Sequence, residues 1–162
     1  MSYHYGIAPE AVVQLDDMRL ARIRSLEYID PIVLNFKTFN TIHPRRITNN
    51  KSSLLINWVY PDSTIGGIRC TEDTLFYTVT KEDTFYQPLI SRADDLIVGD
   101  LLQSNSYINP KIFAIYKYPD IEDTMFIFDS PESDDMVVNN VRIYIRTGGV
   151  QYYEKRSRMV GY

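Results

Sequence analysis

Apolar and polar residues alternate along the run that begins after Pro31. Ile32, Leu34 and Phe36 fall on one face of an extended chain, whereas Asn35 and Lys37 fall on the other. A repeat of two residues is typical of a strand that buries one face and exposes the other. The pattern therefore predicts a strand over residues 32–37.

Three further runs, between Lys111 and Tyr153, are rich in β-branched and aromatic residues. They cover residues 112–118, 125–128 and 141–146, and acidic turns and a Gly-Gly turn separate them. Such residues suit a half-buried pleated surface, so the pattern predicts a β-meander. Earlier in the chain, residues 54–60 predict a strand that ends at a proline, and the Gly66-Gly67 pair predicts a tight turn.

The segment 9–26 is the best candidate for a helix. Pro9 suits an early helical position, and Ala11, Leu15, Met18 and Leu26 recur at the spacing of one helix face. Arg22 interrupts this apolar stripe, and residues 23–29 fit a strand equally well. The pattern favours a helix but leaves a strand open for its second half.

These elements predict a mainly β protein, an antiparallel sandwich or partly open barrel of about seven to nine strands, with one N-terminal helix and extended terminal arms. At 162 residues the chain fits one domain. We expect an N-terminal arm and helix over 1–30, a β domain over 31–153 and a basic C-terminal tail over 154–162.

Charge is segregated along the last third of the chain, although the net charge is only −4. Seven carboxylates with no basic residue among them form acidic loops: Asp120, Glu122, Asp123, Asp129, Glu132, Asp134 and Asp135. The chain from residue 142 onward instead carries a balance of +4. Either these charges pair across a sheet, or the acidic loops of one copy contact the basic tail of the next.

Both ends of the chain are rich in tyrosine, which favours protein interfaces because one end of its side chain is apolar and the other polar. We therefore expect the ends to act as docking arms, together with the basic tail. This predicted interaction set comprises Tyr3, Tyr5, Tyr152, Tyr153, Tyr162, Lys155, Arg156 and Arg158. Cations beside aromatic rings also suit single-stranded nucleic acid, but the acidic total makes that partner unlikely.

Candidate catalytic residues are few. The histidines are His4 and His43, and Cys70 is the one cysteine, which we interpret as a small buried hydrophobe. A Cys70–His43 pair formed in space stays open, but none of the common nucleotide, hydrolase or zinc motifs is present. The sequence therefore predicts no enzyme activity, no catalytic residue and no cofactor.

The acidic loop 129–135 is the candidate metal site of the sequence. Its carboxylates are clustered as calcium ligands can be, but the loop lacks the glycine and terminal glutamate of an EF-hand. We therefore assign no metal site, and calcium binding stays open. The single cysteine, the lack of a long apolar run and the polar start predict a protein that is cytoplasmic when synthesised and has no membrane span.

Together these features predict a non-enzymatic structural protein that acts through protein–protein contacts with other subunits, as a homo-oligomer or hetero-assembly. A tail, neck or baseplate component of a tailed-phage virion fits this description. The alternative is a small acidic binding module that inhibits or regulates a host enzyme or a nucleic-acid-binding protein.

Overall fold

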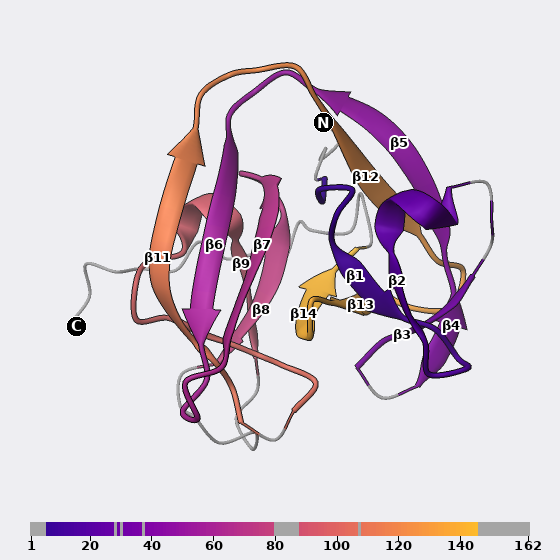
Figure 1. The fold of residues 1–162 in the computed structure, drawn as a ribbon, viewed down its shortest axis with the longest axis horizontal. Coiled ribbons are helices and arrows are strands. Elements are labelled where there is room, and N and C mark those ends of the chain that lie inside the picture. The colour runs from indigo at the N-terminus through magenta and orange to yellow at the C-terminus, as the bar shows by residue number, and fades with distance from the viewer. Residues whose placement is uncertain are drawn as a thin grey trace.

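A computed structural model describes residues 6–27, 29, 31–36, 38–79, 88–106 and 108–145 of the chain (Figure 1). In these residues the strands are β1 (Val12–Gln14), β2 (Leu20–Arg22), β3 (Ile32–Leu34), β4 (Phe39–Thr41), β5 (His43–Asn49), β6 (Ser53–Val59), β7 (Ile65–Thr71), β8 (Leu75–Val79), β9 (Leu89–Arg92), β10 (Leu101–Leu102), β11 (Lys111–Tyr118), β12 (Asp123–Asp129), β13 (Asp135–Val138) and β14 (Val141–Tyr144). Two short 3-10 helices, η1 (Ile23–Leu26) and η2 (Ala93–Asp95), complete the set.

A long bent ribbon of two antiparallel chain segments is the frame of the fold. One segment runs through β5 and β6, the other through β11 and β12. The ladder pairs Asn49 with Asp123 on one side of the bend and Ser53 with Tyr118 on the other. Figure 1 shows both segments crossing from one half of the molecule to the other at the same place. The ribbon therefore connects the two halves.

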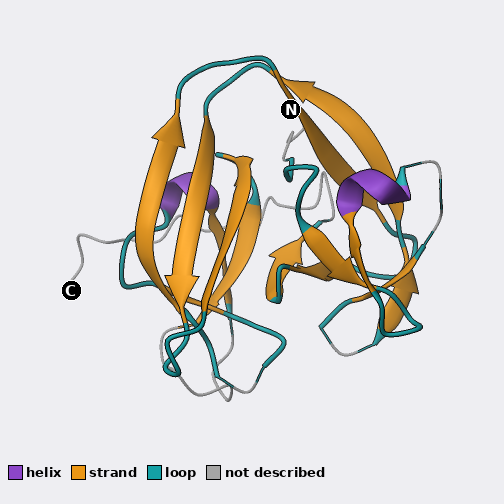
Figure 2. Cartoon of the chain, viewed as in Figure 1, coloured by secondary structure: helices purple, strands orange, loops and turns teal. Residues whose placement is uncertain are grey.

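The strands assemble into one large sheet and three two-stranded pairs. The large sheet has the order β13-β14-β8-β10-β11-β6-β7, and β9 pairs with β8 beside this path. The smaller pairs are β12 with β5, β1 with β2, and β3 with β4. All strand pairings are antiparallel, and Figure 2 shows how little of the described chain is helical.

The larger of two hydrophobic clusters draws its side chains from the large sheet and from the smaller strand pairs. Its largest fully buried side chains include Trp58 from β6, Phe76 from β8, and Phe126 and Phe128 from β12. The first segment of the chain contributes to the same cluster through Ile7, Val13 and Ile23. Residues 6–27 are therefore an integral part of the packed structure.

The predicted mainly β, antiparallel fold is confirmed, but the predicted N-terminal helix is wrong. Residues 9–26 form the β1–β2 hairpin and η1 instead. The chain reverses after β1, where Met18 takes a left-handed φ of 72° and Asp17 accepts a hydrogen bond from the Arg19 amide at 3.1 Å. Among the described residues, no helix is long and apolar enough to cross a membrane.

The predicted meander is also wrong, although its strands exist. β11 pairs with β6, β12 with β5, and β14 with β13 and β8, so the three strands are not neighbours. The Gly66-Gly67 pair lies inside β7 rather than in a turn. The reversal occurs four residues earlier, where the Tyr60 amide donates to the Thr64 carbonyl at 2.8 Å.

Candidate functional site

The segment Gly6–Ala8 enters the fold between β7 and β12. Ile7 and Phe126 exchange two backbone hydrogen bonds of 2.9 Å, and Ile7 also bridges to Cys70 of β7. On the β7 side, the Ala8 amide donates to the Arg69 carbonyl at 2.9 Å. This short segment therefore joins the large sheet to the β5–β12 pair.

Both backbone polar groups of Gly6 are bound by threonines of β7 and the turn that follows it. The Gly6 amide donates to the Thr71 Oγ1 hydroxyl at 2.8 Å. The Gly6 carbonyl accepts from the Thr71 amide at 2.9 Å and from Thr74 Oγ1 at 3.2 Å. These three hydrogen bonds hold the backbone of Gly6 in one orientation.

Asp73 completes what we call the hydroxyl cluster, which consists of Thr71, Asp73 and Thr74. Thr71 Oγ1 donates to Asp73 Oδ1 at 2.7 Å and lies 3.0 Å from Thr74 Oγ1. Thr71 and Thr74 are buried, so their hydroxyls interact in a medium that screens charge weakly. The carboxylate thus orients a hydroxyl that is aimed at a backbone nitrogen.

The local sequence explains this cluster. Thr71 ends β7, and the Thr74 amide donates back to the Thr71 carbonyl at 3.2 Å, which closes a turn around Asp73. The sequence indicated only an acidic turn that leads into an aromatic strand. The available signal was the pair of hydroxyls three residues apart on either side of that turn.

Ion pairs of Arg69 connect the segments around Gly6–Ala8. The Arg69 guanidinium contacts Glu10 at 3.1 Å and also pairs with Asp123 of β12. The Arg69 side chain is 23% exposed, so these pairs are partly shielded from solvent. Arg69 thereby ties β7 to the N-terminal segment and to β12 at once.

The last described strand ends beside the same turn. In the ladder between β14 and β8, Tyr144 lies opposite Leu75, the residue that follows Thr74. Ile145, the last described residue, donates its amide to the Asp134 carbonyl at 2.8 Å. Gly6 and Tyr144 therefore lie beside the same turn, Gly6 against Thr71 and Thr74 and Tyr144 opposite Leu75.

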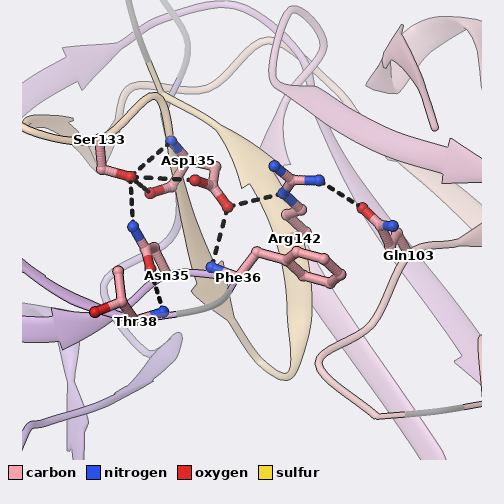
Figure 3. A network of polar contacts seen from close by, with 7 residues as sticks. All are labelled: Asn35, Phe36, Thr38, Gln103, Ser133, Asp135 and Arg142. Carbon is pink, nitrogen blue, oxygen red and sulfur yellow. Dashed lines mark hydrogen bonds and ion pairs between the residues drawn. The ribbon is translucent and has the colours of Figure 1, made fainter. Parts of the chain in front are cut away.

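A polar network holds this last hairpin in place (Figure 3). Arg142 Nε donates to Asp135 Oδ2 at 2.8 Å, and its Nη1 donates to Gln103 Oε1 at 2.8 Å. The guanidinium carbon lies 4.4 Å from the Phe36 ring centroid and 3.8 Å from that of Tyr77. This cation–π sandwich fixes β14 against β8 and the loop after β3.

The network continues from Asp135 into the loop after β3. Asp135 Oδ2 accepts the Phe36 amide at 3.1 Å, and Ser133 Oγ donates to the Asp135 carbonyl at 2.8 Å. Asn35 Nδ2 in turn donates to Ser133 Oγ at 2.8 Å. Polar groups that are buried here therefore have partners from segments about 100 residues apart.

The structure separates the predicted acidic loops into two groups. Asp123, Asp129 and Asp135 form ion pairs inside the chain with Arg69, Arg45 and Arg142 respectively. The other four are exposed or at a turn: Asp120, Glu122, Glu132 and Asp134. The rest of the predicted interaction set lies outside the described residues: Tyr3, Tyr5, Tyr152, Tyr153, Tyr162, Lys155, Arg156 and Arg158. Contacts of either set with other subunits stay a prediction.

The structure also places the two residues of the suggested Cys–His pair. Cys70 is fully buried on β7, whereas His43 begins β5 and lies opposite Asp129. These strands belong to different sheets. In the part of the chain that the structure describes, no three His, Cys, Asp or Glu side chains are grouped as a metal site would need.

Burial raises the pKa of the Cys70 thiol to about 12. We expect Cys70 to stay unlabelled by iodoacetamide at pH 8 in the folded protein and to react fully in 6 M guanidinium, because the thiolate is the nucleophile. An unfolded thiol loses its proton near pH 8.5, so above that pH the folded state should lose stability. Mass spectrometry measures the labelling, and rapid labelling of the folded protein would contradict this burial.

The arrangement of strands matches solved structures of inteins. The gp41-1 intein superposes with a TM-score of 0.67 at 17% identity, over 88% of this chain and 99% of that one. The PabCDC21-1 intein gives 0.70 at 13% identity, over 87% and 98% of the two chains, and the TvoVMA intein gives 0.69 at 10% identity, over 86% and 96%. This chain has the intein fold. No family model and no curated protein matches the sequence.

The intein fold overturns the functional predictions made from sequence. Inteins are protein-splicing domains, which are enzymes that process their own chain. The prediction of a non-enzymatic structural protein of a phage virion is therefore wrong, as is the alternative of an acidic inhibitory module. Sequence reasoning failed because the described site contains hydroxyls and a backbone amide, which no common catalytic motif marks.

Proposed function

We propose that this chain is a self-processing domain that cleaves the Tyr5–Gly6 peptide bond. The observation that carries the proposal is that the hydroxyl cluster forms hydrogen bonds with the backbone of Gly6. Thr71 Oγ1 lies 2.8 Å from the Gly6 nitrogen, and Thr71 and Thr74 bind the Gly6 carbonyl. The amine side of the bond is thus fixed beside a proton carrier.

The choice of bond follows from the pairing of the residues around it. The Gly6–Ile7 bond is buried, and Ile7 is locked to Phe126 by two hydrogen bonds. The Gly6 nitrogen, which donates to Thr71 Oγ1, belongs to the preceding bond. The Tyr5–Gly6 bond is therefore the one whose nitrogen contacts the hydroxyl cluster.

The chemistry that these residues support is hydrolysis. A water oxygen adds to the Tyr5 carbonyl carbon, the bond from this carbon to the Gly6 nitrogen breaks, and the nitrogen takes a proton. The Asp73 carboxylate takes up the proton that the water loses, and Thr71 Oγ1, which is hydrogen-bonded to Asp73, gives its own proton to the nitrogen and receives that one in exchange. The products are a Tyr5 carboxylic acid and a Gly6 amine, which ionise to a carboxylate and an ammonium at neutral pH. Placed proton transfer of this kind typically contributes about 10²–10⁴-fold to a rate.

Water is the nucleophile in this scheme because, among the residues that the structure describes, the side chains near Gly6 do not provide one. Gly6 has no side chain, and the raised pKa of Cys70, about 12, keeps its thiol protonated at neutral pH. Thr71 Oγ1 accepts the Gly6 amide hydrogen, so it lies in the plane of the peptide rather than above the carbonyl carbon. That position excludes attack by Thr71 Oγ1 on the carbonyl carbon. Proton transfer follows the addition of water, when the C–N bond loses its double-bond character and the nitrogen can turn its lone pair toward Oγ1.

The test is a fusion of a stable carrier protein to the N-terminus of the full chain. We expect the purified fusion to release the carrier over hours at neutral pH. Thr71→Val keeps the shape of the side chain but removes the hydroxyl, so it should slow release at least about tenfold. Thr48→Val, in the exposed part of β5, is the matched control and should leave the rate unchanged. Gel electrophoresis follows the release.

Two results would overturn the proposal. One is a folded native fusion that stays intact over days. The other is equal slowing by Thr71→Val and Thr48→Val while circular dichroism shows both variants to be folded.

A further inference from the structure

Gly6 lies in a slot that has no room for a side chain. A Cβ atom built on Gly6 would be 2.7 Å from the Met125 Cβ, 3.3 Å from the Met125 Cγ and 3.2 Å from the Ile47 Cδ1. Real Cβ atoms essentially never come within 3.0 Å of another atom. A side chain at position 6 therefore fits only if β12 or the Gly6 segment moves.

The obstruction cannot be relieved by rotating a side chain. The Met125 Cβ is attached directly to the backbone of β12, and Met125 is fully buried. The next residues, Ile7 and Phe126, hold the two segments together with paired hydrogen bonds. On the other side, Thr71 and Thr74 hold the Gly6 peptide. A larger residue would have to displace one of these contacts.

Lack of space demands a glycine at this position, because a Cβ on Gly6 would meet the Met125 Cβ at 2.7 Å. Gly99 shows a different case: a Cβ there would meet nothing within 4 Å, and its left-handed φ of 100° is what favours glycine. Only glycine fits beside Met125 without moving a neighbour.

We propose that Met125 makes this domain specific for glycine on the amine side of the bond it cleaves. The proposal rests on the proposed self-processing and names its substrate class, a chain whose residue after the cleaved bond is glycine. A serine, cysteine or alanine at position 6 collides with the Met125 Cβ, so its peptide leaves the hydroxyl cluster. Met125 acts by excluding side chains and takes no part in proton transfer.

The experiment uses the same carrier fusion with Gly6→Ala. We expect carrier release to slow at least tenfold and the melting temperature to fall by several degrees, because overpacked sites are destabilised. Gly67→Ala in β7 is the matched control: there the added Cβ meets the end of the Asn57 side chain, which can rotate away, and its nearest backbone atom is the Ile56 carbonyl oxygen at 3.1 Å. It should have a smaller effect on both quantities.

The rescue variant is Gly6→Ala combined with Met125→Gly. Met125→Gly removes the obstructing Cβ, so adding Gly6→Ala to it should cost less stability than Gly6→Ala costs in the native chain. Met125→Ala keeps the Cβ and should give no rescue. Gly6→Ala without loss of stability or release, or equal costs in both backgrounds, would overturn the role of Met125.

Hydrogen exchange provides a readout that needs neither cleavage nor a foldable Met125→Gly variant. In Gly6→Ala, the Ile7 and Thr71 amides should lose protection because they bond to the displaced segment, whereas the Ile56 amide in β6 should keep it. Unchanged protection of Ile7 and Thr71 would overturn the proposal. If the native fusion does not cleave, the proposed function fails, while exchange and melting still decide whether Met125 excludes side chains.

Discussion

Asp135→Ala is expected to lower the free energy of unfolding by about 3–5 kcal/mol, the usual cost of removing one partner of a buried ion pair. The Asp135 side chain is 10% exposed and that of Arg142 is 20% exposed. Without the carboxylate, the Arg142 guanidinium keeps Gln103 and two aromatic rings but no anion. The Phe36 amide loses its acceptor as well.

The matched control is Asp129→Ala, which removes an exposed ion pair. Arg45 and Asp129 are 2.8 Å apart, but their side chains are 60% and 42% exposed. Exposed pairs typically contribute about 0–1 kcal/mol, so this loss should be small. Urea denaturation followed by tryptophan fluorescence measures both variants. Equal losses would mean that the Asp135–Arg142 pair does not hold the hairpin.

Trp58→Ala should cost about 3–5 kcal/mol, as truncation of a fully buried aromatic residue does. Trp58 is 0% exposed on β6, the strand that lies between β11 and β7, and Gly66 of β7 lies against the edge of its indole. A Cβ on Gly66 would be 2.7 Å from the Trp58 Cε2, so the two positions are fitted to each other. The cavity left by alanine therefore cannot be filled by a neighbour moving inward without breaking strand pairing.

Tyr116→Ala on the adjacent strand is the control for Trp58→Ala. Tyr116 is 56% exposed, so its loss should change stability by roughly 0.5 kcal/mol or less. Thermal unfolding followed by circular dichroism measures both. A Trp58→Ala protein as stable as Tyr116→Ala would show that the core is not centred on β6.

The sequence predicts strands well where β-branched and aromatic residues are dense, because these residues favour a pleated, half-buried surface. The runs at β6, β11 and β12 are examples. The sequence does not predict which strands pair. β11 and β12 are consecutive, but a bend sends them to different partners, and that bend is set by contacts with β5 and β6.

β3 shows how long-range hydrogen bonds override the hydrophobic pattern. The alternation predicted Ile32 on the buried face, but Ile32 is 40% exposed while Val33 and Asn35 are buried. Asn35 is buried because Ser133 and the Thr38 amide satisfy its side chain. A shift of one residue moves every side chain to the other face, and the partner that causes it is 98 residues away.

The candidate site could not be predicted from the sequence, because it too depends on contacts between distant residues. Thr71, Asp73 and Thr74 are ordinary turn residues in sequence, and their significance comes from Gly6, which the fold brings beside them. Gly66 and Gly67 are similar, because the sequence indicates a turn where the structure needs space for Trp58 and Asn57. Local patterns show where the chain bends, but not which distant backbone lies at the bend.

Intact mass spectrometry of the carrier fusion tests the central claim most directly. Self-processing at the proposed bond predicts a product with the mass of residues 6–162, whose first residue is Gly6, and a carrier that ends in Tyr5. The product should form from purified protein without any added protease. A fusion that stays whole, or a cut at any other bond, would contradict the account.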